Sequence, residues 1–301
     1  MRKNKGDDDD MKYLEGKSAL ITGGGRGIGK AVALEFAKNG ANIAIAARTR
    51  SELENTTEEI ENFGVEGKSI VVDLTNLDEI KKCVRKYFQY FKKCDVLVNN
   101  AGKTQYASIV DYPIEEAKKL FDLNILGSYA ITKYILPNMV SNQAGSVIFT
   151  SSVQGNIYFG SKKVAYAASK AALSAMSKCL QIELSRHNIR VNAILPGPIN
   201  TKMMDYLIEQ GQHSGSPDQP DEIAPIYLFL ASSLSERKYK GELINQQRLF
   251  QILTDINAAL DPMHASMKEI LNKMKEQFGK DSYRFLRKNK DLIEFMLNYK
   301  Q

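Results

Sequence analysis

The chain has 301 residues, a hydrophobic share of 43% and a formal net charge of +6, enough for one large packed domain or two ordinary ones. Its basic residues are spread out, and the local excess at 280–290 fits a solvated helix face, so no nucleic-acid-binding stripe is indicated. No apolar run reaches the roughly 18 residues that a membrane span needs, and the three cysteines and three histidines show no metal-ligand spacing.

The N-terminus is polar and has no apolar stretch. Arg2, Lys3 and Lys5 come before an acidic run from Asp7 to Asp10, a pattern of neither a secretion signal nor a transit peptide. We predict a disordered tail over residues 1–12, whose acidic run is either native or an artificial addition. An odd number of cysteines without an export signal predicts reduced thiols and a cytoplasmic location.

The first predicted strand, over residues 17–22, leads into a glycine-rich turn and then a helix over 27–39. The turn reads Gly23-Gly24-Gly25-Arg26-Gly27-Ile28-Gly29. This order favours a pyrophosphate site, because glycines allow close approach of the backbone and the helix N-terminus offers free N–H groups. The spacing is Gly-x-x-x-Gly-x-Gly rather than the more common Gly-x-Gly-x-x-Gly.

Strand and helix patterns alternate up to residue 245. Further strands are predicted near 42–47, 68–73, 94–98, 145–150 and 189–194, and further helices near 50–62, 76–92, 113–140, 165–186 and 220–233. The alternation predicts an α/β fold over residues 13–245: a doubly wound parallel sheet with helices on both faces. Ligands of such sheets bind at the carboxyl ends of the strands.

Tyr166 and Lys170 lie four residues apart in the helix predicted over 165–186, and therefore share one face. An ammonium there is expected to favour the phenolate and to lower the pKa of Tyr166 from roughly 10. A tyrosine with a lowered pKa can exchange a proton with a carbonyl oxygen or an alcohol. Taken alone, such a pair is far more often a half-buried ring beside a solvated amine.

The C-terminal residues 246–301 are predicted to be a helical extension, separated into helices at Asp261-Pro262 and at Gly279. Because short helices need a surface on which to bury their apolar face, we expect packing on the preceding domain, on a second subunit or on another protein, and favour the first. Three apolar stripes define the extension: Leu249, Ile252, Leu253, Ile256 and Leu260; Met267, Ile270, Leu271, Met274 and Phe278; and Phe285, Leu286, Leu292, Phe295 and Met296.

Several of these motifs together resemble the short-chain dehydrogenase/reductase family: the turn from Thr22 to Gly29, Asn99-Asn100-Ala101-Gly102, and Tyr166-x-x-x-Lys170. The resemblance covers about residues 14–245 and is greatest to the 3-oxoacyl-carrier-protein reductase group. It implies a Rossmann fold, a nicotinamide cofactor and hydride transfer between that cofactor and a carbonyl compound or secondary alcohol.

The resemblance implies four catalytic residues. Tyr166 would exchange the proton, and Lys170 would lower the tyrosine pKa and bind the nicotinamide ribose. Ser152 would donate a hydrogen bond to the substrate oxygen, and Asn124 would keep a helix locally open and hold a water near Lys170. Ser152 precedes Tyr166 by fourteen positions where thirteen is usual in the family, so Ser151 stays an alternative.

The cofactor residues implied by the resemblance come from the glycine turn, the strand ends and the loop after residue 195. Asp73 matches the family's adenine-contacting acid. The second strand ends at Arg48 and lacks the carboxylate that would repel a 2′-phosphate; with Arg26 nearby, we predict NADP(H) (NADPH in reduction), unless both arginines are only surface charges. The full set is Gly23, Arg26, Gly27, Ile28, Gly29, Arg48, Asp73, Leu74, Asn100, Ala101, Gly102, Tyr166, Lys170, Pro196, Gly197, Ile199 and Thr201.

The substrate is left open among the classes that the family uses. A 3-oxoacyl thioester is the first candidate and a sugar or polyol the second; carbonyl reduction is favoured. Residues 203–221, with Gly211, Gly215, Pro217 and Pro220, are predicted to form a mobile lid over the substrate.

Two other classes of function stay open at this stage. The missing family ending after Gly241-Glu242-Leu243-Ile244-Asn245 supports a non-catalytic nucleotide sensor or scaffold, and residues 246–301 alone would suit an interaction module. The resemblance also implies a homo-oligomer, dimer or tetramer, packed through helices at 111–140 and 165–186, with the dimer preferred.

Overall fold

The computed structural model of the protein describes residues 12–211, 216–236, 238–260 and 265–299. The chain divides into two compact units, Met1–Leu243 and Ile244–Gln301. Apart from Lys12, the predicted disordered tail lies outside the described residues, as does Gly215 of the predicted lid.

The described residues form a seven-stranded sheet in the order β3-β2-β1-β4-β5-β6-β7, and its first six strands belong to the first unit. Strands β1 to β6 pair in parallel, and the order reverses between β1 and β4, where ligands of such sheets bind. The predicted doubly wound α/β fold is thus confirmed. The strands are β1 (Ser18–Thr22), β2 (Asn42–Ala47), β3 (Gly67–Val71), β4 (Val96–Asn99), β5 (Gly145–Thr150), β6 (Ile189–Leu195) and β7 (Leu243–Asn245).

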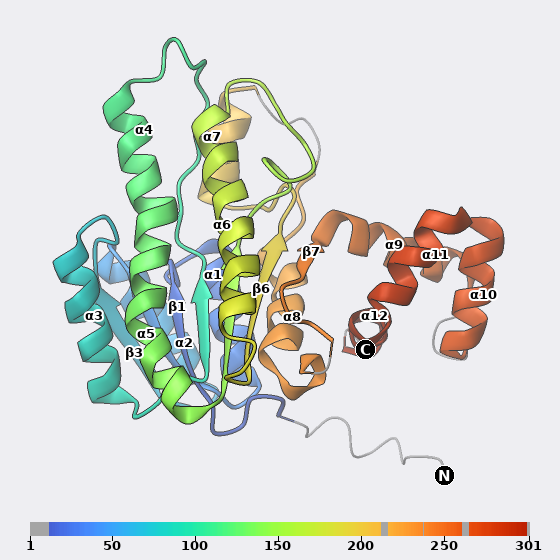
Figure 1. Ribbon diagram of the computed structural model, residues 1–301, viewed down its shortest axis with the longest axis horizontal. Helices are drawn as coiled ribbons and strands as arrows, with labels where there is room; N and C mark the ends of the chain where they lie inside the picture. Colours follow the sequence, from blue (N-terminus) through green and yellow to red (C-terminus); the bar gives the residue numbers. More distant parts are fainter. Residues whose placement is uncertain (1–11, 212–215, 237, 261–264, 300–301) are drawn as a thin grey trace. The chain divides into compact units, whose positions relative to one another are not determined.

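Helices cover both faces of the sheet (Figure 1). On one face, α3 (Leu77–Tyr90), α5 (Ser128–Asn142) and α6 (Val164–Glu183) share a buried core with the strands. On the other, α1 (Gly27–Lys38) contacts α2 (Arg50–Glu61) and α8 (Pro220–Ala231). Burial on both sides explains why the strands are continuous apolar runs.

The helix predicted over 113–140 is not one regular helix. The structure has α4 (Ile114–Phe121), then a π-helical segment, η1 (Asp122–Gly127), and then α5. Single π-helical turns inside α-helices are frequently found at functional sites. Asn124 lies within this segment and is fully buried, so the irregularity falls on a predicted catalytic residue.

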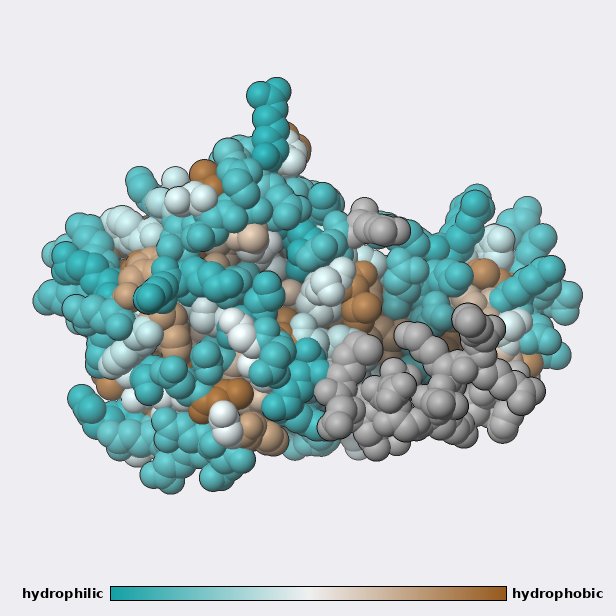
Figure 2. All heavy atoms as spheres, turned by 90° about the horizontal axis from the view of Figure 1, so that it is seen from below, coloured by the Kyte–Doolittle hydropathy of each residue, from teal (hydrophilic) through white to brown (hydrophobic). Residues whose placement is uncertain are grey.

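Figure 2 shows the face that lies at the bottom of Figure 1. This face is mainly hydrophilic and carries separate small apolar patches. Cys83, Cys94 and Cys179 are free thiols. No helix in the described part of the chain combines the length and apolar character that crossing a bilayer requires.

The described residues of the second unit form four helices: α9 (Gln246–Ala259), α10 (Met267–Gln277), α11 (Gly279–Lys288) and α12 (Lys290–Tyr299). Ser266 and Glu269 form a capping box at the start of α10, while Asp261-Pro262 lies outside the described residues. The third predicted stripe is divided between α11 and α12, which separate at Asn289. The helices contact one another, so part of their apolar surface is covered within this unit.

Candidate active site

A cleft of about 370 Å³ lies at the carboxyl ends of β1, β4, β5 and β6. Most of the predicted site residues line it, although they come from segments far apart in the sequence. Gly29, Asp73 and Asn124 do not. Those that do are Gly23, Arg26, Gly27, Ile28, Arg48, Leu74, Asn100, Ala101, Gly102, Ser152, Tyr166, Lys170, Pro196, Gly197, Ile199 and Thr201.

The glycine turn has the shape of a phosphate cradle. Gly23 and Gly27 have φ of +67° and +55°, values that favour glycine. A Cβ at Gly29 would overlap the carbonyl oxygen of Gly23, so its role is close packing of helix against turn. The first turn of α1 carries no acidic residue and its N-cap makes no side-chain hydrogen bond. The N–H groups there can therefore receive a pyrophosphate.

A hydrogen-bond network fastens this turn to the end of β4. The Thr22 hydroxyl accepts from the backbone N–H groups of Asn100 (3.0 Å) and Ala101 (3.1 Å). The Asn100 amide donates to the Thr22 carbonyl at 3.1 Å and to the Gly23 carbonyl at 3.3 Å. These hydrogen bonds hold the carboxyl ends of β1 and β4 together at the base of the cleft. The residue types present fit a nicotinamide dinucleotide.

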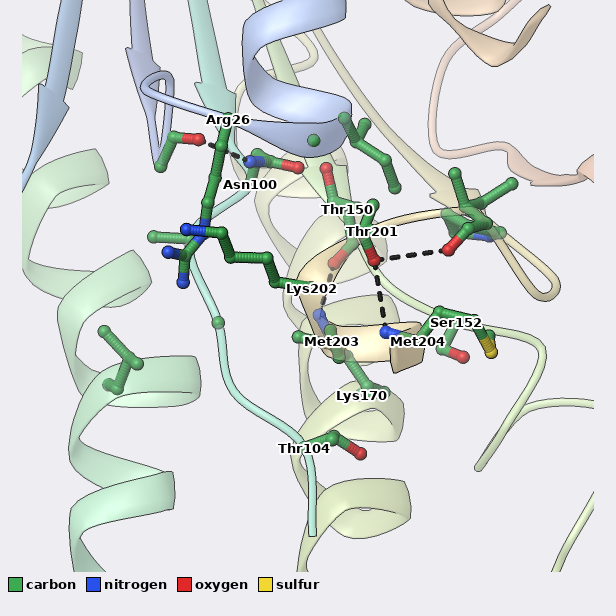
Figure 3. A pocket seen from close by; sticks show the side chains of 18 of the residues that line it. Arg26, Asn100, Thr104, Thr150, Ser152, Lys170, Thr201, Lys202, Met203 and Met204 are labelled. Atoms are coloured by element: carbon green, nitrogen blue, oxygen red, sulfur yellow. Dashed lines mark hydrogen bonds between the residues drawn. The ribbon is translucent and has the colours of Figure 1, made fainter. Parts of the chain in front are cut away.

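Two cations meet a single carboxylate beside the glycine turn. Glu52 Oε1 accepts from Arg26 Nη1 at 2.9 Å and from Lys202 Nζ at 3.0 Å. Figure 3 shows the Arg26 and Lys202 side chains reaching the same side of the pocket. Burial acts to raise the pKa of Glu52, but the hydrogen bonds from Lys202 and Arg26 outweigh it and the pKa lies below its usual value. Glu52 and Lys202 were not predicted, because they are 150 residues apart.

Asp73 is not part of the cleft lining, although Val72 and Leu74 on either side are. Its Oδ1 accepts from the Thr75 N–H at 2.9 Å and from the Thr75 hydroxyl at 2.8 Å. The adenine contact predicted for this carboxylate therefore stays a prediction, and in the structure Asp73 shapes the turn after β3.

Tyr166 lies near the start of α6 and is only 9% exposed. The N-terminus of this helix is capped by a residue that is distant in the sequence: Gln105 Oε1 accepts from the N–H of Ala165 (2.9 Å) and of Tyr166 (3.3 Å). Gln105 is itself buried and was missed at the sequence level, because the cap spans 60 residues. It fixes the backbone that carries the phenol.

The predicted lowering of the Tyr166 pKa by Lys170 is wrong for this arrangement. Burial raises the pKa of Tyr166 above its ordinary value, and the hydrogen bond with Ser152 acts in the opposite direction. Lys170 Nζ lies 5.8 Å from the Tyr166 ring centroid and donates to the Thr150 carbonyl at 2.8 Å. Lys170 is only 4% exposed, and burial lowers its pKa to about 8.

The two adjacent serines have different surroundings. Ser151 Oγ donates to the Lys170 carbonyl at 2.7 Å and lies 2.9 Å from Ser174 Oγ. It therefore fastens β5 to α6. Ser152 Oγ instead interacts with Tyr166 and accepts from the Gln154 N–H at 3.1 Å. The geometry thus favours Ser152 over Ser151 as the serine that faces a substrate oxygen.

Asn124 supports the site from behind the cleft. Its Oδ1 accepts from the Lys103 N–H at 2.9 Å, and its Nδ2 donates to the Lys103 carbonyl at 3.0 Å and to Ser169 Oγ at 2.9 Å. These bonds tie the π-helical segment to the loop that follows Gly102 and to α6. The helix is π-helical at Asn124, while the water that this residue was predicted to hold near Lys170 stays a prediction.

The loop after β6 closes the remaining side. Thr201 Oγ1 accepts from the Met204 N–H and so caps α7 (Lys202–Glu209). Met203, Met204 and Leu207 of this helix line the cleft and give it an apolar wall. In the described part of the chain, no group of three or more His, Cys, Asp or Glu could hold a metal ion.

Comparisons with known proteins agree with this geometry. The family model for short chain dehydrogenase matches residues 17–212. A 3-oxoacyl-acyl-carrier-protein reductase of Thermotoga maritima is 38% identical over 229 residues, 74% of this chain and 93% of that protein. A short-chain type dehydrogenase/reductase from Mycobacterium marinum has a TM-score of 0.74 and 33% identity, covering 78% of this chain and 96% of that one. An NAD+-bound xylitol dehydrogenase has a TM-score of 0.73 and 27% identity, covering 78% and 99%.

Proposed function

The chain belongs to the short-chain dehydrogenase/reductase family of oxidoreductases, and from this membership we propose that it transfers hydride between NADP(H) and a carbonyl compound or secondary alcohol. The observation that carries the proposal is that Ser152, Tyr166 and Lys170 line the same cleft as the glycine turn. A non-catalytic sensor would not need all three in this place.

The residues have separate tasks in the proposed reaction. The nicotinamide, when bound, supplies or accepts the hydride, and the Asn100–Gly102 segment and the loop at 196–201 would hold it. Tyr166 gives its phenolic proton to the carbonyl oxygen or takes one from the alcohol. Ser152 donates a hydrogen bond to the same oxygen, where charge develops. Lys170, whose amine donates to the Thr150 carbonyl, would also bind the nicotinamide ribose, and Asn124 keeps the surrounding segments in position.

The preference for NADP(H) is supported by the charges near the glycine turn. Arg26, Arg48 and Lys202 line this part of the cleft, whereas Glu52 is the one carboxylate among the described lining residues. The excess of positive charge suits a 2′-phosphate, for which guanidinium groups are well shaped.

We expect Arg48→Ala to reduce the ratio of kcat/KM with NADPH to that with NADH by about 10- to 100-fold, the loss of one charge-assisted hydrogen bond. Turnover would be followed by absorbance at saturating carbonyl substrate. Arg50→Ala is the matched control, because Arg50 pairs with Glu54 at 3.7 Å and does not line the cleft. Equal use of both cofactors by the native protein, or a preference for NADH, would contradict the proposal.

Two substrate classes are supported by different relatives. The Thermotoga maritima protein is a 3-oxoacyl-acyl-carrier-protein reductase, which makes a 3-oxoacyl thioester the first candidate here. The xylitol dehydrogenase makes a polyol or sugar the second. Oxidation of NADPH with a panel of 3-oxoacyl thioesters, ketoses and small ketones would separate them; tight cofactor binding without turnover of any would favour the sensor.

We also propose a cytoplasmic homodimer packed through the helices predicted for that role. Leu126, Tyr129 and Ile182 are 53%, 54% and 75% exposed on η1, α5 and α6. Sedimentation should give a dimer, and Tyr129→Asp with Ile182→Asp should shift it towards monomer, because a charge on each chain would be buried unpaired. Leu77→Asp on α3, at a residue 54% exposed, should leave the dimer intact. A monomeric native protein would refute this assembly.

A further inference from the structure

Lys163 is a cation at the catalytic end of the cleft to which the proposed mechanism gives no task. It comes three residues before Tyr166 and lines the cleft together with Ser152 and Tyr166. The side chain is half-buried, and burial lowers the pKa of Lys163 below its ordinary value. Within the described ranges, no carboxylate lies in ion-pair distance of it, so the cost of removing this charge from water is not offset.

The charges of the cleft are unevenly distributed. Among the described lining residues, the single acid is Glu52, which lies by the glycine turn and already accepts from Arg26 and Lys202. Lys163 and Lys170 therefore face the cleft without a neighbouring acid. An anion entering this end meets positive charge, and a neutral molecule would leave Lys163 unpaired.

Thr104 adds a hydrogen-bonding group from the adjacent segment. The Ala107 N–H donates to the Lys162 carbonyl at 3.0 Å and Gln105 caps α6, so residues 104–107 run alongside the start of that helix. Thr104 lines the cleft, and its buried hydroxyl has no hydrogen-bond partner among the described residues. Figure 3 shows Thr104 on the same side of the pocket as Lys170.

We propose that the substrate carries an anionic group, a carboxylate or a phosphate, which Lys163 and Thr104 bind while the reacting oxygen lies at Ser152 and Tyr166. This inference rests on the proposed function and narrows it. An ammonium and a hydroxyl together donate charge-assisted hydrogen bonds to such a group. The apolar wall from Met203, Met204 and Leu207 would then enclose the carbon chain between the two ends.

The test compares charged ketones with neutral partners of similar shape. Levulinate would be compared with methyl levulinate, and dihydroxyacetone phosphate with dihydroxyacetone, in NADPH oxidation assays. In the native protein, we expect the charged member of one pair to have a KM at least about 10-fold lower, the effect of one hydrogen bond to a charged group. The pair with the larger difference identifies the anion as carboxylate or phosphate.

Lys163→Gln should raise the KM of the charged member by about 10-fold more than that of its neutral partner. Lys162→Gln is the matched control, because Lys162 is exposed and its ammonium lies 5.0 Å from the Tyr106 ring centroid; it should keep the native preference. Thr104→Val should reduce the preference in the same direction.

The outcomes separate this inference from the proposed function. Turnover with equal KM for charged and neutral members, or a preference that persists in Lys163→Gln, overturns the anionic substrate and leaves the oxidoreductase standing. Absence of turnover with every ketone counts against the proposed function, and the inference then falls with it.

Discussion

Tyr166→Phe is expected to lower kcat by about 10³-fold or more, the range that a positioned general acid contributes. The substitution removes only the phenolic oxygen, which is the proton donor in the proposed reaction. Ring packing against Leu120 and Ala165 is kept, so NADPH should bind with an unchanged Kd, measured by fluorescence titration. The kinetic measurement is NADPH oxidation with the best substrate of the panel.

Tyr112→Phe provides the matched control. Tyr112 packs against the same small apolar cluster, and its hydroxyl donates to the Glu116 carbonyl at 3.3 Å rather than facing the cleft. It should keep near-native kcat. If Tyr166→Phe turned over at the native rate, the assignment of the proton donor, and with it the proposed mechanism, would be wrong.

Lys170→Met is expected to change how stability depends on pH as well as to reduce turnover. The pKa of Lys170 is about 8 in the folded protein and roughly 10.4 in an unfolded chain. Between these values the unfolded state binds more protons, so the folded state of the native protein gains stability as pH rises. The gain amounts to about 3 kcal/mol across the window, and the Met variant lacks it.

The measurement is urea unfolding of both proteins at pH 7.5 and at pH 10. Other lysines and tyrosines titrate in the same interval, so the informative quantity is the difference between native protein and variant. We expect Lys170→Met to be more stable relative to the native protein at the lower pH than at the higher one. A constant difference would mean that the Lys170 amine is not desolvated as the structure places it. Lys133→Met, on α5 and outside the cleft lining, is the control.

Local patterns explain how much of the fold was predictable. The strand, glycine turn and helix from Ser18 to Lys38 follow from side-chain periodicity and glycine conformations over a few neighbouring residues. The helix predicted over 113–140 shows the limit of this approach, because a π-helical segment of six residues is too short for its own period to be distinguished from the α-helical patterns on either side. The hydrogen bonds of Asn124 to Lys103 and Ser169, which accompany this turn, cross between segments.

For the site, too, local patterns predicted which residues lie on one element but not which distant segments they contact. Spacing within α6 placed Tyr166 and Lys170 on one helix, but it did not show that the amine donates to Thr150 or that burial raises the tyrosine pKa. For Asp73, a motif position predicted an adenine contact, which stays a prediction. Only the tertiary structure showed that the Asp73 carboxylate accepts from the Thr75 N–H and hydroxyl.

The sequence by itself determined the alternating α/β architecture, the glycine turn between β1 and α1 and the pairing of Tyr166 with Lys170 on one helix, because each depends on residues close together in the chain. Only the tertiary structure decided that Ser152 rather than Ser151 faces Tyr166, that Gln105 caps the helix of the phenol, and that Glu52 joins Arg26 to Lys202. These contacts join residues that are 26, 60 and 150 positions apart in the sequence, or they distinguish two adjacent serines. Which partners these side chains find, and how far burial removes them from water, depends on how segments distant in the sequence pack together. A local sequence pattern does not contain that information.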